Sequence, residues 1–271
     1  MSTPGLVQKK GEGKPEIGPE TRRLTAPEIF HAASENARGE LRRSTRKLAF
    51  SGLAGGITMG LTPLGVASLQ SLLGPGSRQH LIASLMYPVG FIAVIIGRAQ
   101  LFTENTLYPV ILVLDERRYV LRTLRLWAVV FASNVVGAFL FSLLATKSSA
   151  LRPDILTELI HTGVVALSGS GSHLFWSGVI GGWLIALVAW TVTASHWTIG
   201  QLAMIFLLTF VVGVGGFAHC IAGSGEILSA VMGGSASASS YFHWLLCATL
   251  GNICGGVIIV SLLNYGQVRE L

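Results

Sequence analysis

Residues 97–106 read GRAQLFTENT and interrupt an apolar run that extends from residue 81 to residue 114. Residues 215–226 read GGFAHCIAGSGE and interrupt a second apolar run, from 202 to 232. Each run is longer than the roughly 20 residues that cross a bilayer. Non-helical backbone at membrane depth is tolerated only where protein or a water-filled cavity satisfies its polar groups. The two segments therefore predict broken membrane helices that line a pathway.

Four further apolar runs are long enough to cross a membrane, at residues 48–73, 124–146, 173–194 and 243–264. The chain of 271 residues is 51% hydrophobic and only 12% charged, whereas roughly a quarter of the residues in soluble domains are charged. We therefore predict an all-α polytopic membrane protein with six transmembrane helices, of which the second and fifth are broken. The three cysteines show no metal-type spacing, so neither a disulfide, a metal site nor a cofactor is expected.

The charged residues concentrate before Leu48, where 10 of the 19 Lys and Arg and 6 of the 13 Asp and Glu lie. Residues 1–26 combine three prolines with mixed charge and predict a disordered cytoplasmic tail. Residues 27–47 have the pattern of an amphipathic basic helix on an anionic membrane surface, so membrane lipids are expected partners. This basic cluster abuts a hydrophobic segment, so nucleic-acid binding is not expected. The channel domain should cover residues 48–265, and residues 266–271 a second cytoplasmic tail.

Basic residues also indicate the orientation in the membrane. The connection between the second and third spans carries Arg117, Arg118, Arg122 and Arg125, whereas the connections after the first and third spans carry few bases. By the positive-inside rule, we expect a multi-pass protein of the cell inner (plasma) membrane with both termini in the cytoplasm. The charged stretch 152–161 is expected to be an amphipathic external segment rather than a span.

The two halves of the chain carry matching motifs. Residues 52–57 (GLAGGI) match residues 178–183 (GVIGGW), and residues 134–137 (NVVG) match residues 252–255 (NICG). Because each half contains three spans, the second half must enter the membrane from the opposite side. We therefore predict two inverted three-helix repeats, with helix packing at Asn134, Gly137, Asn252 and Gly255.

The ionisable residues at membrane depth fall in the two interrupting segments, as Arg98, Glu104, His219 and Glu226. A charge inside a membrane costs at least a few kcal/mol, so this clustering favours function or mutual pairing. We predict that Arg98 and Glu104 form an ion pair, and that the charged residues have structural or gating roles. Half-helices that begin near residues 104–106 and near Ser224 would direct amide groups at a small anion.

Three motifs together resemble the formate/nitrite transporter family: residues 101–105 (LFTEN), 216–219 (GFAH) and 252–256 (NICGG). The resemblance covers about residues 30–265. It implies an aquaporin-like fold, five protomers each with its own pore, and passage of a small monovalent weak-acid anion such as formate, nitrite, hydrosulfide or lactate. It also implies that Thr103 and His219 face each other between two hydrophobic constrictions.

Leu101 and Phe102 are expected to narrow one side of this polar station, and Asn105 and Phe217 complete the predicted path. Three positions depart from the usual family pattern. Gln100 and Ala218 occupy positions where acids are common in the family, and Glu104 occupies a position where a small residue is usual.

Two functions other than anion transport would require motifs that the sequence does not contain. Paired Asn-Pro-Ala motifs, expected of a water channel, do not occur in the sequence. A Gly-x-Ser-Gly nucleophile, expected of an intramembrane serine protease, does not occur either, so no enzymatic activity is predicted. The alternative that remains is a pore of the same fold that is occluded or conducts a neutral small solute, and that acts as a structural or regulatory membrane protein.

Overall fold

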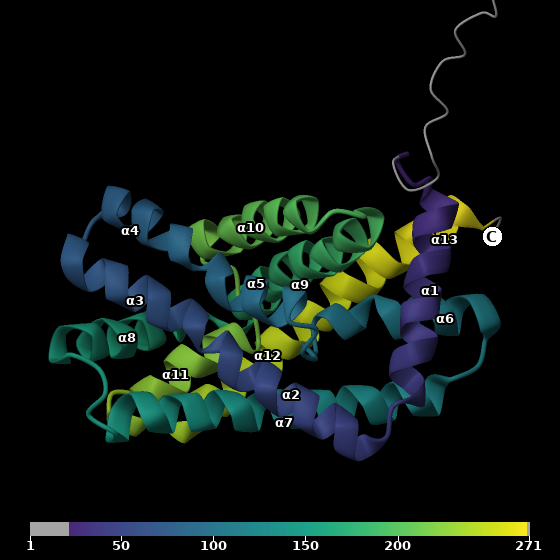
Figure 1. Ribbon diagram of the computed structural model, residues 1–271. Helices are drawn as coiled ribbons and strands as arrows, with labels where there is room; N and C mark the ends of the chain where they lie inside the picture. Colours follow the sequence, from purple (N-terminus) through teal and green to yellow (C-terminus); the bar gives the residue numbers. More distant parts are fainter. Residues whose placement is uncertain (1–21, 270–271) are drawn as a thin grey trace, which may run out of the picture.

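The computed structural model describes residues 22–269, so the predicted disorder of residues 1–21 lies outside the described residues. The described part of the chain forms a bundle of helices (Figure 1). The helices are α1 (Ala26–Arg42), α2 (Thr45–Met59), α3 (Leu61–Leu73), α4 (Ser77–Ala83), α5 (Pro88–Ile96), α6 (Tyr108–Glu116), α7 (Val120–Lys147), α8 (Pro153–Ala166), α9 (Gly171–Ala194), α10 (Thr198–Gly215), α11 (Ala222–Met232), α12 (Ala238–Cys254) and α13 (Leu263–Val268). Short helical turns lie at Ser84–Met86, Glu104–Thr106 and, as a π-helix, Gly255–Leu262.

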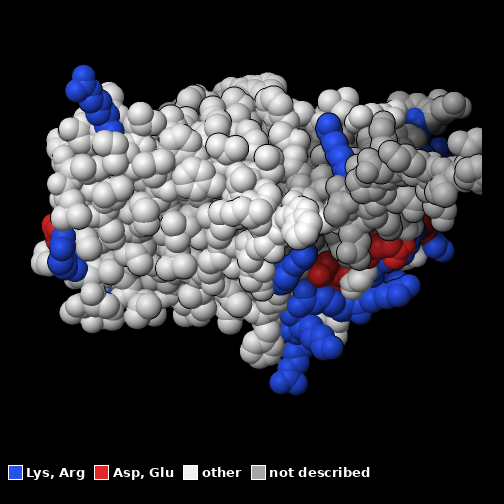
Figure 2. All heavy atoms as spheres, turned by 45° about the horizontal axis from the view of Figure 1, so that its top comes forward, with Lys and Arg blue, Asp and Glu red and all other residues white. Residues whose placement is uncertain are grey.

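Within the described residues, six helical stretches are long and apolar enough to cross a membrane, which confirms the six predicted spans. They are Thr45–Leu73, Ser77–Ile96, Val120–Lys147, Gly171–Ala194, Thr198–Gly215 and Ala238–Val268. Figure 2 shows the consequence at the surface, where charged side chains gather toward the ends of the molecule and the broad middle of the face carries none. The protein is a multi-pass membrane protein.

The helices stop within both interrupted runs. Between α5 and α6 the backbone leaves the helix at Gly97 and Arg98, and Arg98 has a left-handed φ of 58°. Between α10 and α11 the corresponding turn uses Gly216, with φ +61°, a conformation that glycine adopts without steric cost. Pro109 stands in the first turn of α6, where its missing N–H leaves no helical bond unmade. Two shorter helices, α6 and α11, therefore follow the two non-helical segments.

The long helices approach each other closely at the predicted glycines. A Cβ atom on Gly137 of α7 would lie 2.6 Å from the Ile57 nitrogen and the Leu53 oxygen of α2. A Cβ atom on Gly255 would lie 2.6 Å from the Trp183 nitrogen of α9. Backbone contact of this kind is typical of helix packing through small residues in membranes.

Helix α8 covers most of residues 152–161, which were predicted to be an amphipathic external segment rather than a span. With 14 residues it is shorter than the six spans, and it packs against α3 and α11 and lies alongside them in Figure 1. Leu159 is fully buried, and Gly163 lies against the backbone of Glu226, where any side chain would collide. Packing against these helices buries apolar side chains of α8.

Helix α1 also differs from the expectation, because its apolar face is covered by protein rather than left free for a membrane surface. Ile29, Phe30 and Ala33 are buried in a cluster with residues of α6 and α9, and Figure 1 shows α1 running across the end of the bundle that also holds α13. Glu116 at the end of α6 forms an ion pair with Arg38 of α1. The hydrogen bond from Arg38 lowers the pKa of the Glu116 carboxyl below its ordinary value.

The two basic stretches of the sequence meet at this end of the molecule. Arg125 of α7 donates hydrogen bonds to the backbone oxygens of Leu41 and Arg43, at 3.1 and 2.9 Å. The arginine-rich connection before α7 and the basic stretch after α1 therefore lie on one side of the bundle.

Candidate functional site

Thr103 and His219 are in contact in the buried interior of the bundle. The Thr103 Oγ1 and His219 Nε2 atoms are 2.8 Å apart, and the two residues are 0% and 1% exposed. Each lies on one of the two non-helical segments, so two stretches of chain 116 residues apart build one polar contact.

Hydrogen bonding indicates which ring nitrogen of His219 carries the proton. The backbone N–H of Ala222, at the start of α11, donates to His219 Nδ1 at 3.0 Å. An accepting Nδ1 has no proton, so the neutral ring carries its proton on Nε2 and donates it to the Thr103 hydroxyl. The Thr103 hydroxyl proton is then free to point toward another acceptor.

Two asparagines hold the non-helical segments in place through equivalent sets of hydrogen bonds. Asn134 of α7 accepts from the Phe102 N–H at 2.9 Å and donates to the Gly52 and Gln100 oxygens at 2.7 and 2.9 Å. Asn252 of α12 accepts from the Cys220 N–H at 2.9 Å and donates to the Gly178 and Ala218 oxygens, both at 2.8 Å. The partners correspond at the offsets found between the two halves of the sequence. These contacts satisfy backbone groups that a broken helix would otherwise leave unpaired.

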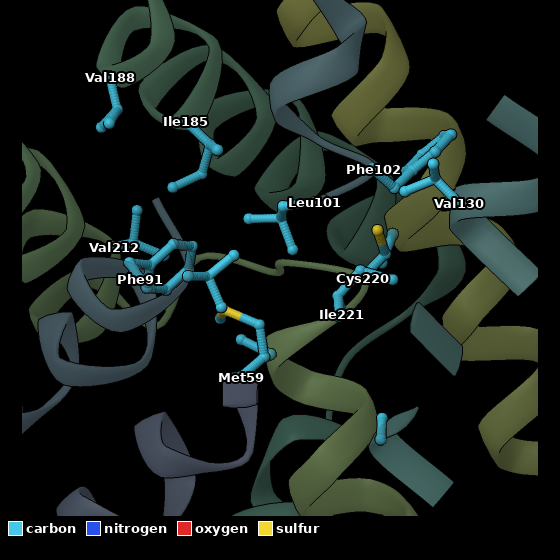
Figure 3. Close-up of a cluster of buried hydrophobic side chains, with 14 of the residues drawn as sticks. Met59, Phe91, Leu101, Phe102, Val130, Ile185, Val188, Val212, Cys220 and Ile221 are labelled. Carbon is cyan, nitrogen blue, oxygen red and sulfur yellow. The ribbon is translucent and has the colours of Figure 1, made fainter. Parts of the chain in front are cut away.

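An apolar barrier lies beside the polar station. Leu101 is fully buried, and Figure 3 shows it among Phe91, Ile185 and Met59, with Val188 and Val212 nearby. Phe91 also meets the His219 ring edge-on, with ring centroids 5.0 Å apart. Of these residues only Leu101 was predicted, because single apolar residues inside apolar spans carry no distinguishing signal in the sequence.

Phe102, which was predicted to narrow the path with Leu101, points away from Leu101 and packs against α7. Its ring packs edge-on against Trp127 and Phe131 of α7, with centroids 5.8 and 5.0 Å away, and Figure 3 shows it beside Val130, away from Leu101. Because Asn134 holds the Phe102 N–H toward α7, the side chain anchors the segment to that helix.

Two cavities approach the station from opposite ends of α9. The first has a volume of about 240 Å³ and is lined by His219, Phe217 and Glu226 together with residues from the start of α9. The second has a volume of about 90 Å³ and is lined by Glu104, Asn105 and Gln100 together with Val192 near the end of α9. The buried Leu101 and Thr103 lie on the chain between Gln100 and Glu104, outside the lining of both cavities. Asn105 lines its cavity and also donates to Gln100 Oε1 at 2.9 Å and to the Leu101 oxygen at 3.0 Å.

Arg98 and Glu104 line the same cavity but do not form the predicted ion pair. Among the residues that the structure describes, no ion pair within 4.0 Å involves either side chain. The turn at Arg98 exposes its side chain, whereas Glu104 is only partly exposed.

Comparisons with known proteins agree with this geometry. The family model described as "Formate/nitrite transporter" matches residues 27–266. The "Inner membrane protein YfdC" of Escherichia coli (strain K12) is 30% identical over 267 residues, which cover 97% of this chain and 86% of that protein. A solved "FNT family ion channel" has a TM-score of 0.81 at 22% identity and covers 89% of this chain and 99% of its own. A "Pentameric formate channel with formate bound" has a TM-score of 0.69 at 18% identity and covers 82% and 97%. The fold is that of these channels.

Proposed function

This chain belongs to the formate/nitrite transporter family, and on that premise we propose that it moves a small monovalent weak-acid anion, such as formate or nitrite, past Thr103 and His219. The family is one of transporters and channels and not of enzymes. The observation that carries the proposal is the buried Thr103–His219 contact, approached by a cavity from each end of α9.

The mechanism follows from the cost of crossing the barrier. A weak acid with a carboxyl pKa near 4 arrives charged at neutral pH, and an ion in an apolar constriction costs far more than the neutral acid. The Thr103 hydroxyl can donate a hydrogen bond to the substrate, because it already accepts one from His219. We propose that the substrate is held there as it takes up or gives back a proton, and that it passes Leu101 without charge.

We also propose an inner-membrane location, cytoplasmic termini, an inverted repeat and a pentamer of five separate pores. The meeting of two basic stretches at the end that holds α1 and α13 supports the orientation. The equivalent contacts of Asn134 and Asn252 support the repeat. The description of the similar formate channel as pentameric supports the assembly, and the name of the similar inner membrane protein supports the location.

Flux in liposomes tests the proposal. Purified protein should take up formate or nitrite, and His219→Phe should abolish uptake or change its pH dependence while the oligomer stays intact. His161→Gln is the control, because His161 is exposed on α8 and lines neither cavity. Uptake that is the same in His219→Phe as in the control would remove the histidine from the mechanism.

Labelling tests the orientation. A cysteine introduced by Val120→Cys, at the exposed first residue of the third span, should stay unlabelled by impermeant reagents added outside intact cells. Labelling from outside would contradict the assignment of both termini to the cytoplasm.

A further inference from the structure

The first turn of α2 carries two bases at the end of the helix that favours anions. Arg46 and Lys47 follow the N-cap residue Ser44, and this turn contains no acidic residue. The N-terminus of a helix carries partial positive charge, so cations there are unfavourable unless an anion neutralises them. Both side chains are exposed, and neither forms an ion pair within 4.0 Å with another residue that the structure describes. The start of α2 is therefore suited to bind an anion.

These bases line a depression at the connection between α1 and α2. Its lining contains three bases, two serines and an aromatic ring but no acid: Arg43, Ser44, Arg46, Lys47, Phe50 and Ser51. Arg43 is paired with Glu40 at 2.9 Å, which leaves Arg46 and Lys47 as the charges that can bind a ligand. The Arg46 guanidinium lies over the Phe50 ring, 5.8 Å from its centroid, and this contact restricts where the guanidinium can lie. The depression therefore holds a local excess of positive charge.

An apolar groove begins at the same phenylalanine. Phe50 is 63% exposed and lines both the basic depression and a groove of about 290 Å³ between α2 and α7. The other residues that line the groove are small or aliphatic: Ala49, Leu53, Ala132, Ser133 and Val136. Leu53 lies roughly 9 Å beyond Lys47 along the helix, toward the middle of the span Thr45–Leu73. The groove therefore extends from the charged depression into the region that lipid chains occupy.

Other bases on this side of the molecule also favour an anion. Arg125 of α7 donates to the Arg43 oxygen, and Figure 1 shows the turn between α1 and α2 beside α7. Further exposed bases lie at the start of α7 and just before it, namely Arg117, Arg118 and Arg122. Anionic lipids of the cytoplasmic leaflet attract bases next to a span, and the proposed orientation places these residues on that side. Since protein covers the apolar face of α1, the apolar surface next to these bases belongs to α2 and α7.

We propose that the depression and the groove form one binding site for an anionic phospholipid, with the phosphate at Arg46 and Lys47 and an acyl chain between α2 and α7. The phosphate accepts hydrogen bonds from both bases, and the chain covers Phe50. A free phosphate ion would contact only the basic half of this surface, so the continuity of the two halves favours a lipid. This site goes beyond the proposed function, because it does not depend on the solute that passes Thr103 and His219.

Native mass spectrometry of the purified full-length protein with one added lipid measures the affinity for that lipid. Phosphatidylglycerol, an anion, should bind at least about tenfold more tightly than zwitterionic phosphatidylcholine with the same chains, because each base near the membrane surface contributes roughly fivefold. Arg46→Gln combined with Lys47→Gln should reduce this preference to less than about threefold. The matched control is Arg117→Gln combined with Arg122→Gln, which removes the same charge from two exposed bases that line neither surface. This control should keep most of the preference.

Filling the groove tests the position of the acyl chain. Ala132→Phe, at an exposed position in the groove, should weaken the binding of phosphatidylglycerol by at least about fivefold, because two or more methylene groups lose their contact with protein. Val211→Phe enlarges an exposed apolar side chain of α10 and should leave the affinity unchanged. In thermal unfolding, phosphatidylglycerol should raise the apparent Tm, whereas inorganic phosphate should not.

Three results would overturn the lipid site. The first is an equal loss of preference in the two double variants, which would indicate attraction by the whole basic surface. The second is an unchanged affinity in Ala132→Phe, or a rise in Tm with inorganic phosphate that equals the rise with the lipid. Ala132→Leu replaces Ala132→Phe if size-exclusion chromatography shows that the larger side chain disrupts the oligomer. Loss of the oligomer in both variants is the third result, and it would assign the groove to a contact between copies of this chain.

Discussion

Replacing Thr103 with valine should destabilise the protein through one buried hydrogen bond. Valine has nearly the same shape as threonine, so no cavity forms, but the Nε2–H of His219 loses its acceptor at 2.8 Å. The ring cannot escape by moving its proton to Nδ1, because the Ala222 N–H already points at that atom from 3.0 Å. A buried donor without a partner costs about 1–3 kcal/mol of the free energy of unfolding. At roughly 2–4 °C per kcal/mol, the apparent Tm should fall by roughly 2–12 °C.

Thermal unfolding of the detergent-solubilised protein measures this loss, and Thr103→Ser is the matched control because it keeps the hydroxyl. In a His219→Phe background no ring N–H remains to be satisfied, so Thr103→Val should cost less than it does with His219 present, and the difference measures the coupling of the two side chains. Formate uptake should also fall in Thr103→Val but not in Thr103→Ser. Equal Tm and uptake in the valine and serine variants, with His219 present, would refute the pairing of these side chains as a functional station.

Three further predictions concern the frame around the site. Asn252→Leu removes the three hydrogen bonds that hold the second non-helical segment, and it should lower the free energy of unfolding by about 2–4 kcal/mol. Thermal unfolding measures this loss, and a loss below about 0.5 kcal/mol would contradict the role of Asn252 in holding the segment. Gly137→Ala should disrupt helix packing and lower the yield of folded oligomer. Gly39→Ala is the control, because a Cβ atom there meets nothing within 4 Å, and it should stabilise the protein by about 0.5–1 kcal/mol. Similar effects of the two substitutions on Tm would disprove close packing at Gly137. Because Arg38 depresses the pKa of Glu116, the pair stabilises the attachment of α1 above the unfolded carboxyl pKa of about 4.3 and loses that effect as pH falls through the lower folded value. Glu116→Gln should therefore flatten the acid-induced release of α1 seen by limited proteolysis, and an unchanged pH profile would exclude the pair.

Much of the candidate site could be found from the sequence because its residues are chemically unusual for their setting. A histidine and a threonine inside glycine-rich interruptions of apolar runs stand out, and the two asparagines recur at matching positions in both halves. Phe91, Ile185 and Val212 carried no such signal, since each is an ordinary apolar residue in an apolar span. Nothing local distinguishes an apolar side chain that faces the path from one that faces lipid.

By itself the sequence determined that this is a membrane protein of six spans and where its backbone leaves the helix. Both depend on local properties: hydropathy over about 20 consecutive residues and the conformational freedom of glycine. Only the tertiary structure decided that Phe102 turns to α7, that α1 packs on protein, and that Arg98 and Glu104 share a cavity without pairing. These outcomes depend on which helices, distant in the chain, supply the neighbouring surface and on whether a cavity remains between them. The direction of a side chain follows from that packing, so it cannot be predicted from the local sequence.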